Sequence, residues 1–515
     1  MKGGMYYAEN TGFDDLPEIE LGDFLIDKLE VTNRDFMRFV EVGGYQKKDC
    51  WKNPFIKNGR ILAWNEAMVE FVDKTGRPGP ASWEGGYYPQ GQENYPVSGV
   101  SWYEAAAYAE FAGKSLPSVY HWGGSASITW IECIVPLSNF NQKGCVEVGS
   151  FQGLSACGAF DMAGNVREWC SNDDGENHRY ILGGGWNDAE YSFTDAFAQS
   201  PFDRSLTNGF RCIKYLGVEK KLADLQRPIK RAFRDFSKEK PVSDEIFEIY
   251  KRMYAYDKTD LNPKIESKTE SAEGWTKERV SFDAAYGHER VPAFLYLPKK
   301  TAPPYQAVVI FPPSYVIFQR SSEVFDRGGI YIIDYIVKNG RAVIVPIYKG
   351  TFERGDGLKS DLPEETNFYK EHVFMWSQDF SRTIDYLETR KDIAADKVAY
   401  FGFSWGGAMG AIIPAVEERL KAAVLYVAGF CFQKTLPEVD QINFAPRVKI
   451  PVLMLNGKYD YFFPVDTSQK PFFALLGTPP ENKRQIIYAT SHIVPRPDLI
   501  KETLAWLDKS LGPVK

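Results

Sequence analysis

The stretch Gly402-Phe403-Ser404-Trp405-Gly406 decides the fold of the C-terminal half of this chain. A short β-prone run, residues 397–401, precedes it, and a run of small apolar residues, 407–413, follows it. A G-x-S-x-G pentapeptide between a strand and a helix predicts a sharp turn that exposes the serine hydroxyl at the carboxyl end of the strand. The two glycines leave room for close strand–helix packing, which a Cβ would block. Ser404 is therefore the candidate nucleophile.

An acid and a base follow the serine at suitable places. Residues 450–457 form an apolar run that ends in a turn, and Asp460 comes directly after it. Residues 485–489 are typical of a last strand, and His492 follows in a loop. Of the five histidines in the chain, only His492 follows a strand near the C-terminus. The order Ser404, Asp460, His492 is the chain order of the α/β-hydrolase fold and predicts a serine hydrolase.

The chemistry gives each of these residues a role. A serine hydroxyl is a weak nucleophile at neutral pH, so His492 would take its proton and later pass it to the leaving group. Asp460 would hold the imidazole tautomer and stabilise the imidazolium. Asp466, six residues further on, is the rival acid. We favour Asp460 because it lies nearer the strand end, and we expect Asp466 to cap the following helix.

The oxyanion hole needs two backbone N–H groups that point at the developing charge. Trp405, the residue after the nucleophile, is expected to supply one of them. The other should come from the loop after the apolar run 307–311, which begins Pro312-Pro313-Ser314-Tyr315. Prolines carry no N–H, so Ser314 or Tyr315 must donate, and we favour Tyr315.

Composition limits the class of protein. The chain has 515 residues, of which 44% are hydrophobic and 25% charged, so we expect at least two globular domains. A net charge of −7 gives no reason to expect binding to nucleic acid or to an anionic membrane. The sequence has no apolar run long enough to span a membrane and no signal-peptide core. Seven scattered cysteines without a C-x-x-C pair favour reduced thiols, so we expect a cytoplasmic protein.

The pattern changes near residues 216–240. Residues 1–215 are rich in Gly, Trp, Tyr and Asn, residues 216–240 are charge-rich and predict a solvated linker helix, and residues 241–515 alternate between strands and helices. The predicted strands are 279–282, 291–297, 308–311, 342–346, 398–401, 422–427, 452–455 and 485–488. Helical stretches are expected near 325–338, 375–389, 406–418, 466–476 and 497–511. Such alternation predicts an α/β fold with a mostly parallel sheet.

The first 215 residues resemble the formylglycine-generating enzyme (sulfatase-modifying factor) family. The matching segments, in order, are Phe24-Leu25-Ile26-Asp27-Lys28, Val100-Ser101-Trp102-Tyr103-Glu104-Ala105, Phe160-Asp161-Met162-Ala163-Gly164-Asn165-Val166-Arg167-Glu168-Trp169, Gly183-Gly184-Gly185-Trp186 and Gly209-Phe210-Arg211-Cys212. The resemblance implies a loop-rich, C-type-lectin-like domain. It also implies structural calcium near Asn139, Asn165 and Glu168, where the alternative is that Asn165 and Glu168 only stabilise a turn and a helix.

This domain departs from the enzymes of that family. Those that make formylglycine carry a pair of copper-binding cysteines before the G-F-R segment, but residues 187–208 contain no cysteine. Those that use iron carry a histidine cluster, whereas His121 and His178 lack its spacing. We therefore expect a non-catalytic domain for binding or scaffolding, with no metal required for catalysis. Similar modules precede a hydrolase in some bacterial protein-kinase polypeptides, so the chain is expected to be bacterial and a segment of a longer protein, or else a homo-oligomer.

Residues 241–515 resemble the prolyl-oligopeptidase and dienelactone-hydrolase branch of α/β-hydrolases. The resemblance rests on residues 289–298, on Gly402-Phe403-Ser404-Trp405-Gly406-Gly407, on residues 451–457 with Asp460, and on Ser491-His492. The loop at Pro312-Pro313 departs from the His-Gly or Pro-Gly that relatives carry there. The resemblance implies cleavage of an ester, thioester or small peptide through an acyl-enzyme. The alternative is a degenerate interaction module of a signalling protein.

Two groups of side chains bear on the substrate. Aromatic residues that would line an acyl or aryl pocket are Tyr315, Tyr348, Trp405, Tyr461 and Phe462. Cations that would bind an anionic substrate group are Arg320, Lys349 and Arg354, although solvation or salt bridging is the more common role of such residues. The sequence does not decide between these uses.

Overall fold

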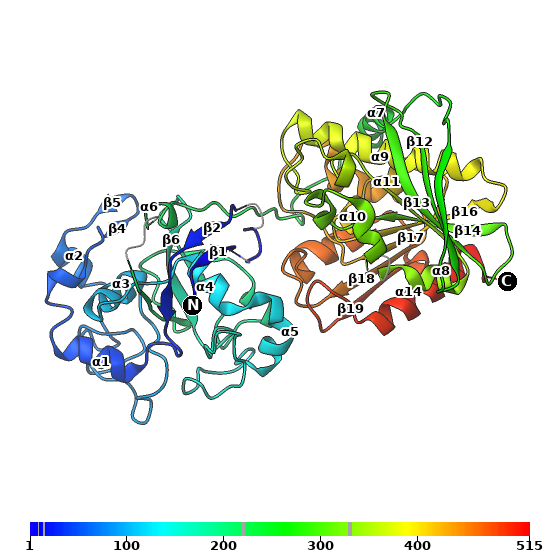
Figure 1. Ribbon diagram of the computed structural model, residues 1–515. Helices are drawn as coiled ribbons and strands as arrows, with labels where there is room; N and C mark the ends of the chain where they lie inside the picture. The colour runs from blue at the N-terminus through cyan, green and yellow to red at the C-terminus, as the bar shows by residue number, and fades with distance from the viewer. Residues whose placement is uncertain (9, 14–15, 218–221, 328–331, 515) are drawn as a thin grey trace. The chain divides into compact units, whose positions relative to one another are not determined.

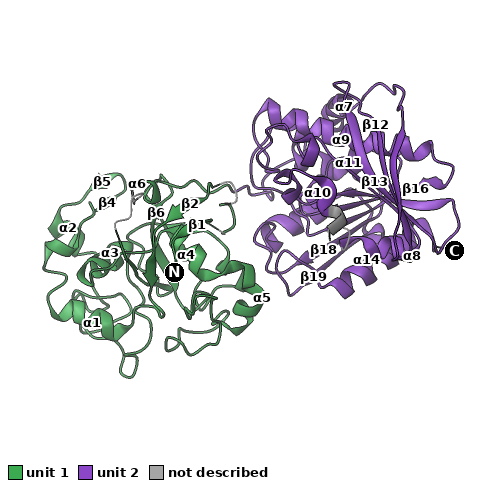
Figure 2. Cartoon of the chain, in the orientation of Figure 1, with its two compact units in different colours: residues 1–232 green, residues 233–515 purple. Residues whose placement is uncertain are grey.

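The computed structural model describes every residue except 9, 14–15, 218–221, 328–331 and 515. The chain divides into two compact units, Met1–Ala232 and Phe233–Lys515 (Figure 2). The boundary lies inside the segment 216–240 that the sequence marks as a linker. Each unit has its own buried core, so the two are described separately.

The first unit consists of short elements joined by long loops (Figure 1). Its strands are β1 (Gly4–Tyr6), β2 (Ile19–Leu21), β3 (Phe24–Ile26), β4 (Ile56–Lys57), β5 (Arg60–Ile61), β6 (Arg167–Asp173), β7 (Arg179–Leu182), β8 (Phe197–Gln199), β9 (Asn208–Gly209) and β10 (Ile213–Tyr215). Its helices are α1 (Asn33–Glu41), α2 (Trp64–Met68), α3 (Trp102–Phe111), α4 (Val119–Ala126), α5 (Ile131–Ile134) and α6 (Leu222–Leu225). The largest sheet has the order β8-β7-β6-β9.

Local sequence explains where the helices of this unit begin. The Ser101 hydroxyl accepts from the Glu104 N–H at 3.2 Å, and the Glu104 carboxylate accepts from the Ser101 N–H at 2.8 Å. This reciprocal pair is a capping box, and it starts α3. Aromatic side chains such as Phe36, Trp83 and Trp169 fill the core with no exposed area. A domain with so little regular structure is held together by this aromatic packing.

The predicted linker helix over 216–240 is wrong for most of its length. Residues 218–221 lie outside the described part, and α6 ends at Leu225, after which no helix begins before residue 244 in the described chain. The segment packs instead of being solvated. The Ile229 N–H donates to the Asp173 carbonyl at 2.8 Å, and the Phe236 ring lies 4.7 Å from that of Phe430, centroid to centroid. Backbone and aromatic contacts in both units therefore replace the helix.

The second unit is built on a nine-stranded sheet of order β11-β12-β13-β15-β14-β16-β17-β18-β19. The strands are β11 (Lys264–Glu270), β12 (Trp275–Asp283), β13 (Arg290–Pro298), β14 (Tyr305–Phe311), β15 (Ala342–Pro346), β16 (Ile393–Phe403), β17 (Leu420–Tyr426), β18 (Val452–Gly457) and β19 (Lys483–Tyr488). The three pairings from β11 to β15 are antiparallel, and the other five are parallel. The predicted, mostly parallel sheet is confirmed. The sequence did not indicate β11, because every residue of this edge strand is exposed and gives no apolar signal.

Helices cover both faces of this sheet. They are α7 (Asp244–Met253), α8 (Asp334–Asn339), α9 (Asn367–Glu388), α10 (Trp405–Met409), α11 (Ile413–Val416), α12 (Gln441–Phe444), α13 (Lys470–Leu475) and α14 (Arg496–Leu511). Figure 1 shows α8 and α14 on one side of the strands and α9 and α11 on the other. Of the helix expected near 325–338, the part at 328–331 lies outside the described residues, and α8 covers only the end.

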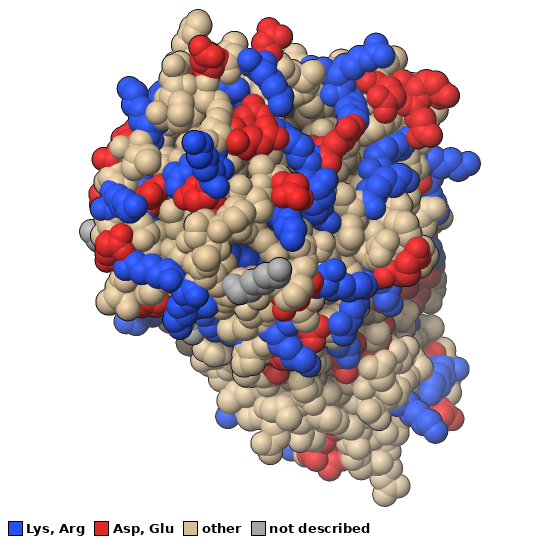
Figure 3. Space-filling view, turned by 90° about the vertical axis from the view of Figure 1, so that its right-hand side faces the viewer, with Lys and Arg blue, Asp and Glu red and all other residues tan. Residues whose placement is uncertain are grey.

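The surface offers no patch of a single charge on the face drawn in Figure 3, where acidic and basic side chains are interspersed. Among the described residues, no helix has the length and apolar character of a membrane span.

Candidate active site

Ser404 lies in a sharp turn between β16 and α10. Its backbone has φ 55° and ψ −106°, a conformation that non-glycine residues rarely adopt. The glycines on either side are required by close contacts. A Cβ on Gly402 would lie 2.1 Å from the Gly406 carbonyl oxygen, and one on Gly406 would lie 2.2 Å from the Phe311 carbonyl oxygen. The pentapeptide therefore forms the strained turn that its pattern predicts.

The structure brings Ser404, Asp460 and His492 together. His492 Nε2 lies 2.7 Å from Ser404 Oγ, and His492 Nδ1 lies 2.8 Å from Asp460 Oδ2. Ser404 follows β16, Asp460 follows β18 and His492 follows β19, so all three stand at the carboxyl ends of parallel strands. The arrangement can move a proton from the serine to the imidazole while the carboxylate holds the other ring nitrogen.

Backbone groups hold the Asp460 carboxylate in place. Its Oδ1 accepts from the N–H groups of Phe462 at 3.0 Å and Phe463 at 3.1 Å, which leaves Oδ2 for the histidine. The rival acid Asp466 does not reach His492. Its carboxylate is half exposed and pairs with Lys470 at 2.6 Å. The expectation that Asp466 caps the next helix is wrong, because Pro464 stands at that position and Asp466 lies in the first turn.

The predicted oxyanion donors lie on two adjoining segments. Trp405 begins α10, and Ser314 and Tyr315 begin a 3₁₀ turn over Ser314–Ile317. Among the described residues, no backbone N–H of these three has a hydrogen-bond partner. The Gly406 N–H donates to the Pro312 carbonyl at 3.2 Å and so ties the proline loop to the elbow. The structure thus leaves both Ser314 and Tyr315 available as the second donor.

The residues predicted to line a substrate pocket differ in burial and in their contacts. Tyr348 is buried, stacks on Phe311 at 4.3 Å between centroids, and donates to the Ile310 carbonyl, so it is a core residue. Phe462 is 37% exposed and lies 4.8 Å from the His492 ring, at the edge of the site. The cation Lys349 pairs with Glu289 at 2.7 Å. Arg354 is likewise neutralised, by Asp379. The third cation, Arg320, has an exposed side chain.

Sequence reasoning did not single out Asp361, which lies in the loop before α9. Burial raises the pKa of its carboxyl to about 6, while the Ser314 hydroxyl and the charge of His492 act in the opposite direction. Both of these neighbours belong to the site around Ser404. No motif surrounds Asp361, so only the tertiary structure indicates that it belongs here.

The residues implied as calcium ligands do not fit a metal as a set. Both oxygens of Glu168 bond to Arg211, at 2.7 Å and 2.6 Å, and one of them also accepts from Trp122. Asn165 Oδ1 accepts from the Asn139 side chain at 3.1 Å and from the Val146 N–H at 2.9 Å. Among the side-chain oxygens of Asn139, Asn165 and Glu168, Asn139 Oδ1 alone is buried without a partner in the described chain. One open oxygen does not make a calcium site, which needs six or more oxygen ligands.

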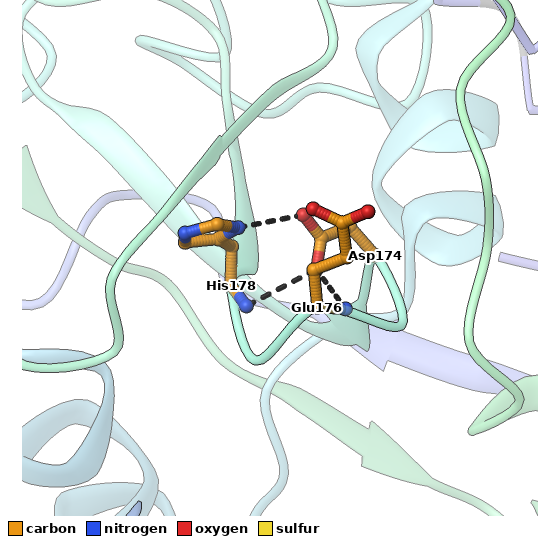
Figure 4. Close-up of side chains that lie close together, drawn as sticks. All are labelled: Asp174, Glu176 and His178. Carbon is orange, nitrogen blue, oxygen red and sulfur yellow. Dashed lines mark hydrogen bonds and ion pairs between the residues drawn. The ribbon is translucent and has the colours of Figure 1, made fainter. Parts of the chain in front are cut away.

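The remaining histidines of the first unit have structural surroundings. His121 is buried, its Nδ1 lies 2.6 Å from the Ser118 hydroxyl, and burial lowers the pKa of its imidazole to about 3. His178 lies beside Asp174 and Glu176 on one loop (Figure 4). The Asp174 carboxylate accepts from two backbone N–H groups and contacts His178 Nδ1, so it stabilises the turn.

The cysteines nearest the G-F-R segment do not offer a metal thiolate. Cys170 and Cys212 are fully buried, and burial raises the pKa of both thiols well above the usual range. Their protonated form is a poor ligand for copper or iron, since the thiolate is the ligand.

Comparison with protein families supports the description of both units. Residues 1–216 match the Sulfatase-modifying factor enzyme 1-like domain, and residues 291–473 match the Dienelactone hydrolase family. The chain joins a sulfatase-modifying-factor-like domain to an α/β-hydrolase. The second unit therefore has the α/β-hydrolase fold and the hydrolase class that the sequence predicts, and the family model that it matches supports ester hydrolysis.

Individual relatives cover parts of the chain. A serine/threonine-protein kinase, Pkn1 of Chlamydia trachomatis, is 31% identical over 39% of this chain and 35% of its own length. The chain thus spans about a third of the kinases that it matches. The formylglycine-generating enzyme of Thermomonospora curvata is 28% identical over 33% of this chain and 69% of its own. A solved acetyl xylan esterase of Thermoanaerobacterium is 15% identical over 52% of this chain and 95% of its own, with a TM-score of 0.41.

Proposed function

We propose that the hydrolase domain cleaves a carboxylic ester by acyl transfer to Ser404, with His492 as general base and acid and Asp460 as the residue that orients it. The observation that carries this proposal is the pair of contacts on the two ring nitrogens of His492, to Ser404 Oγ at 2.7 Å and Asp460 Oδ2 at 2.8 Å. Thioesters and small peptides are accessible to the same chemistry.

In the first half of the reaction, the Oγ–H proton of Ser404 moves to His492 Nε2 as Oγ bonds to the ester carbonyl carbon. The carbonyl oxygen takes up the negative charge, which the Trp405 N–H and the N–H of Ser314 or Tyr315 stabilise. When the intermediate collapses, the alcohol leaves with the proton from His492. Ser404 then carries the acyl group.

In the second half, water takes the place of the serine. His492 removes a proton from a water molecule, which adds to the acyl carbonyl carbon, and the same N–H groups hold the oxyanion. Collapse breaks the bond to Ser404 Oγ, the proton on His492 returns to that oxygen, and the carboxylic acid departs. Throughout, the Asp460 carboxylate keeps Nδ1 protonated and faces the imidazolium, which is why its anchoring by two backbone N–H groups matters.

For the sulfatase-modifying-factor-like domain we propose a binding or scaffolding role without its own catalysis. Three features support this: the absence of cysteine from residues 187–208, the burial of Cys170 and Cys212, and the use of Glu168 in an ion pair with Arg211. Metal analysis after purification with copper, iron or calcium supplied tests it. A stoichiometric transition metal would contradict the proposal.

The test of the hydrolase proposal is covalent labelling. A fluorophosphonate probe should label the wild-type chain at Ser404 and abolish the hydrolysis of 4-nitrophenyl acetate. Ser404→Ala should remove both the labelling and the turnover. Ser381→Ala is a matched control, since Ser381 lies on α9 and should keep both. Labelling that persists in Ser404→Ala, or a folded wild type that neither reacts nor turns over any ester, would overturn the proposal in favour of a binding module.

A further inference from the structure

A small cavity lies against α10, beside the residue that follows the nucleophile. Trp405 and Met409 of α10, Asp361 of the loop before α9, and Gln433 of the segment after β17 all contribute to its lining. It has room for about one water molecule. Because Trp405 directly follows Ser404 in the chain, the cavity adjoins the elbow that carries the candidate nucleophile.

Two buried donors on this lining have no partner. Trp405 is 2% exposed and Gln433 is 8% exposed, and neither Trp405 Nε1 nor Gln433 Nε2 makes a hydrogen bond within the described chain. A buried donor left without a partner destabilises the folded chain, so such groups are satisfied by ordered water or by a bound molecule. Two donors at one small cavity therefore call for an atom that accepts hydrogen bonds, which a water molecule supplies in the free protein and a ligand can supply in its place.

The same cavity holds a carboxylate that no cation neutralises. Arg234 also contributes to the lining, but its guanidinium is engaged by Glu239 and by Asp440, the latter at 2.9 Å. Within the described residues, Asp361 forms no ion pair. A poorly hydrated carboxylate favours a ligand that donates a hydrogen bond or carries positive charge.

The ligand must therefore accept hydrogen bonds from Trp405 and Gln433 and donate one to Asp361. An ammonium group would satisfy Asp361 but would leave Trp405 Nε1 and Gln433 Nε2 without an acceptor. A hydroxyl group donates once and accepts twice, so it can serve the carboxylate and both donors. Its size also matches a cavity that takes about one water molecule.

We propose that Asp361, Trp405 and Gln433 form a subsite for a hydroxyl group of the substrate, so that the preferred esters carry a free hydroxyl close to the ester bond. This inference rests on the proposed ester hydrolysis and names the class of ester. It makes Asp361 and Gln433 specificity-determining residues, separate from the groups that move the proton.

The test uses substrates that differ only by a hydroxyl group. On the acyl side, 4-nitrophenyl glycolate is compared with 4-nitrophenyl acetate, and on the alcohol side 2-hydroxypropyl acetate is compared with propyl acetate. Each ratio of kcat/KM is divided by the ratio of the hydroxide-catalysed rates, which removes intrinsic reactivity. The full-length wild type should prefer the hydroxyl-bearing member of at least one pair by about 10- to 100-fold, as expected for hydrogen bonds to a charged group.

Variants then assign the preference to the cavity. Asp361→Ala and Gln433→Leu should each bring the ratio to within about threefold of one, because kcat/KM falls more for the hydroxyl-bearing ester than for its plain partner. Asp466→Asn, which alters a half-exposed carboxylate paired with Lys470, should keep the wild-type ratio. A cooperative thermal unfolding transition, together with labelling of Ser404 by the fluorophosphonate, shows that a variant is folded.

The outcomes separate the two proposals. A wild type that hydrolyses both members of each pair equally well, or a preference that survives both substitutions, would overturn the hydroxyl subsite and leave the ester hydrolase standing. A wild type that hydrolyses neither member and resists fluorophosphonate would overturn the hydrolase, and the subsite with it.

Discussion

His492 Nε2 lies 2.7 Å from Ser404 Oγ, although 88 positions separate the two residues in the chain. The parallel sheet makes this contact possible, because β16, β17, β18 and β19 are consecutive neighbours whose carboxyl ends meet at one edge. Loops that follow different strands there bring distant residues within hydrogen-bonding distance. The fold thus brings the proposed nucleophile, base and acid together from three separate loops.

Asp460→Asn is expected to lower kcat for ester hydrolysis by about 10³–10⁴-fold with little change in KM. An amide facing His492 Nδ1 favours the wrong tautomer, so Nε2 can no longer accept the serine proton. Steady-state kinetics with 4-nitrophenyl acetate measure this effect. The matched change Asp466→Asn should stay within about twofold of the wild type, and the reverse ranking would make Asp466 the acid.

Gly406→Ala is expected to disrupt the elbow. The new methyl group would lie 2.2 Å from the Phe311 carbonyl oxygen, a backbone atom that cannot move aside cheaply. Overpacking of this kind costs about 1–3 kcal/mol in the free energy of unfolding, and the displaced turn should also lower kcat at least 100-fold. Urea unfolding and ester kinetics test both effects. Gly144→Ala, where nothing lies within 4 Å of the new Cβ, should change neither.

Asp361→Asn is expected to stabilise the protein at neutral pH. The pKa of this carboxyl is raised from 3.8 to about 6 in the folded chain, so the folded state binds more protons than the unfolded state between these values. As the pH rises from about 4 to about 6, Asp361 therefore lowers the free energy of unfolding of the wild type, and this loss remains at higher pH. The amide of the variant does not titrate, so the free energy of unfolding of the variant should exceed that of the wild type by an amount that grows across this window.

Thermal melting of both proteins at pH 4, 5, 6 and 7.5 measures this gain. The difference in Tm should be near zero at pH 4 and reach a few degrees at pH 7.5, from a stability difference on the order of 1–3 kcal/mol. A constant difference at every pH would show that the carboxyl is not titrating in this range.

Arg211→Met is expected to destabilise the first unit by about 3–5 kcal/mol. Both side chains of the Arg211–Glu168 pair have no exposed area, so the substitution leaves a buried carboxylate without its cation. Chemical unfolding followed by tryptophan fluorescence tests it. Arg34→Met is the control, because the Arg34–Glu93 pair spans 3.9 Å at the surface and should contribute less than about 1 kcal/mol. Equal effects of the two changes would contradict the prediction.

Much of the second unit could be predicted because its signals are local. All eight predicted strands occur, from β12 to β19, since each is an apolar run or an alternating apolar and polar run. The edge strand β11 was not predicted, because all of its side chains are exposed and give no apolar signal. The prediction of a linker helix was wrong because its charged, helix-forming residues do not reveal packing partners such as Phe430, which contacts Phe236 in a turn. In the first unit, loop structure follows from aromatic packing, which has no periodic signature.

The sequence by itself determined the candidate nucleophile, the chain order of the candidate acid and base, and the absence of cysteine from residues 187–208, because each is a matter of residue type and local spacing. Tertiary structure alone decided which carboxylate meets His492, which cations are already neutralised, and that Asp361, Gln433 and Trp405 share one cavity. These outcomes depend on which distant segments pack together. Burial then changes the chemistry of a carboxylate that the sequence presents as an ordinary loop residue.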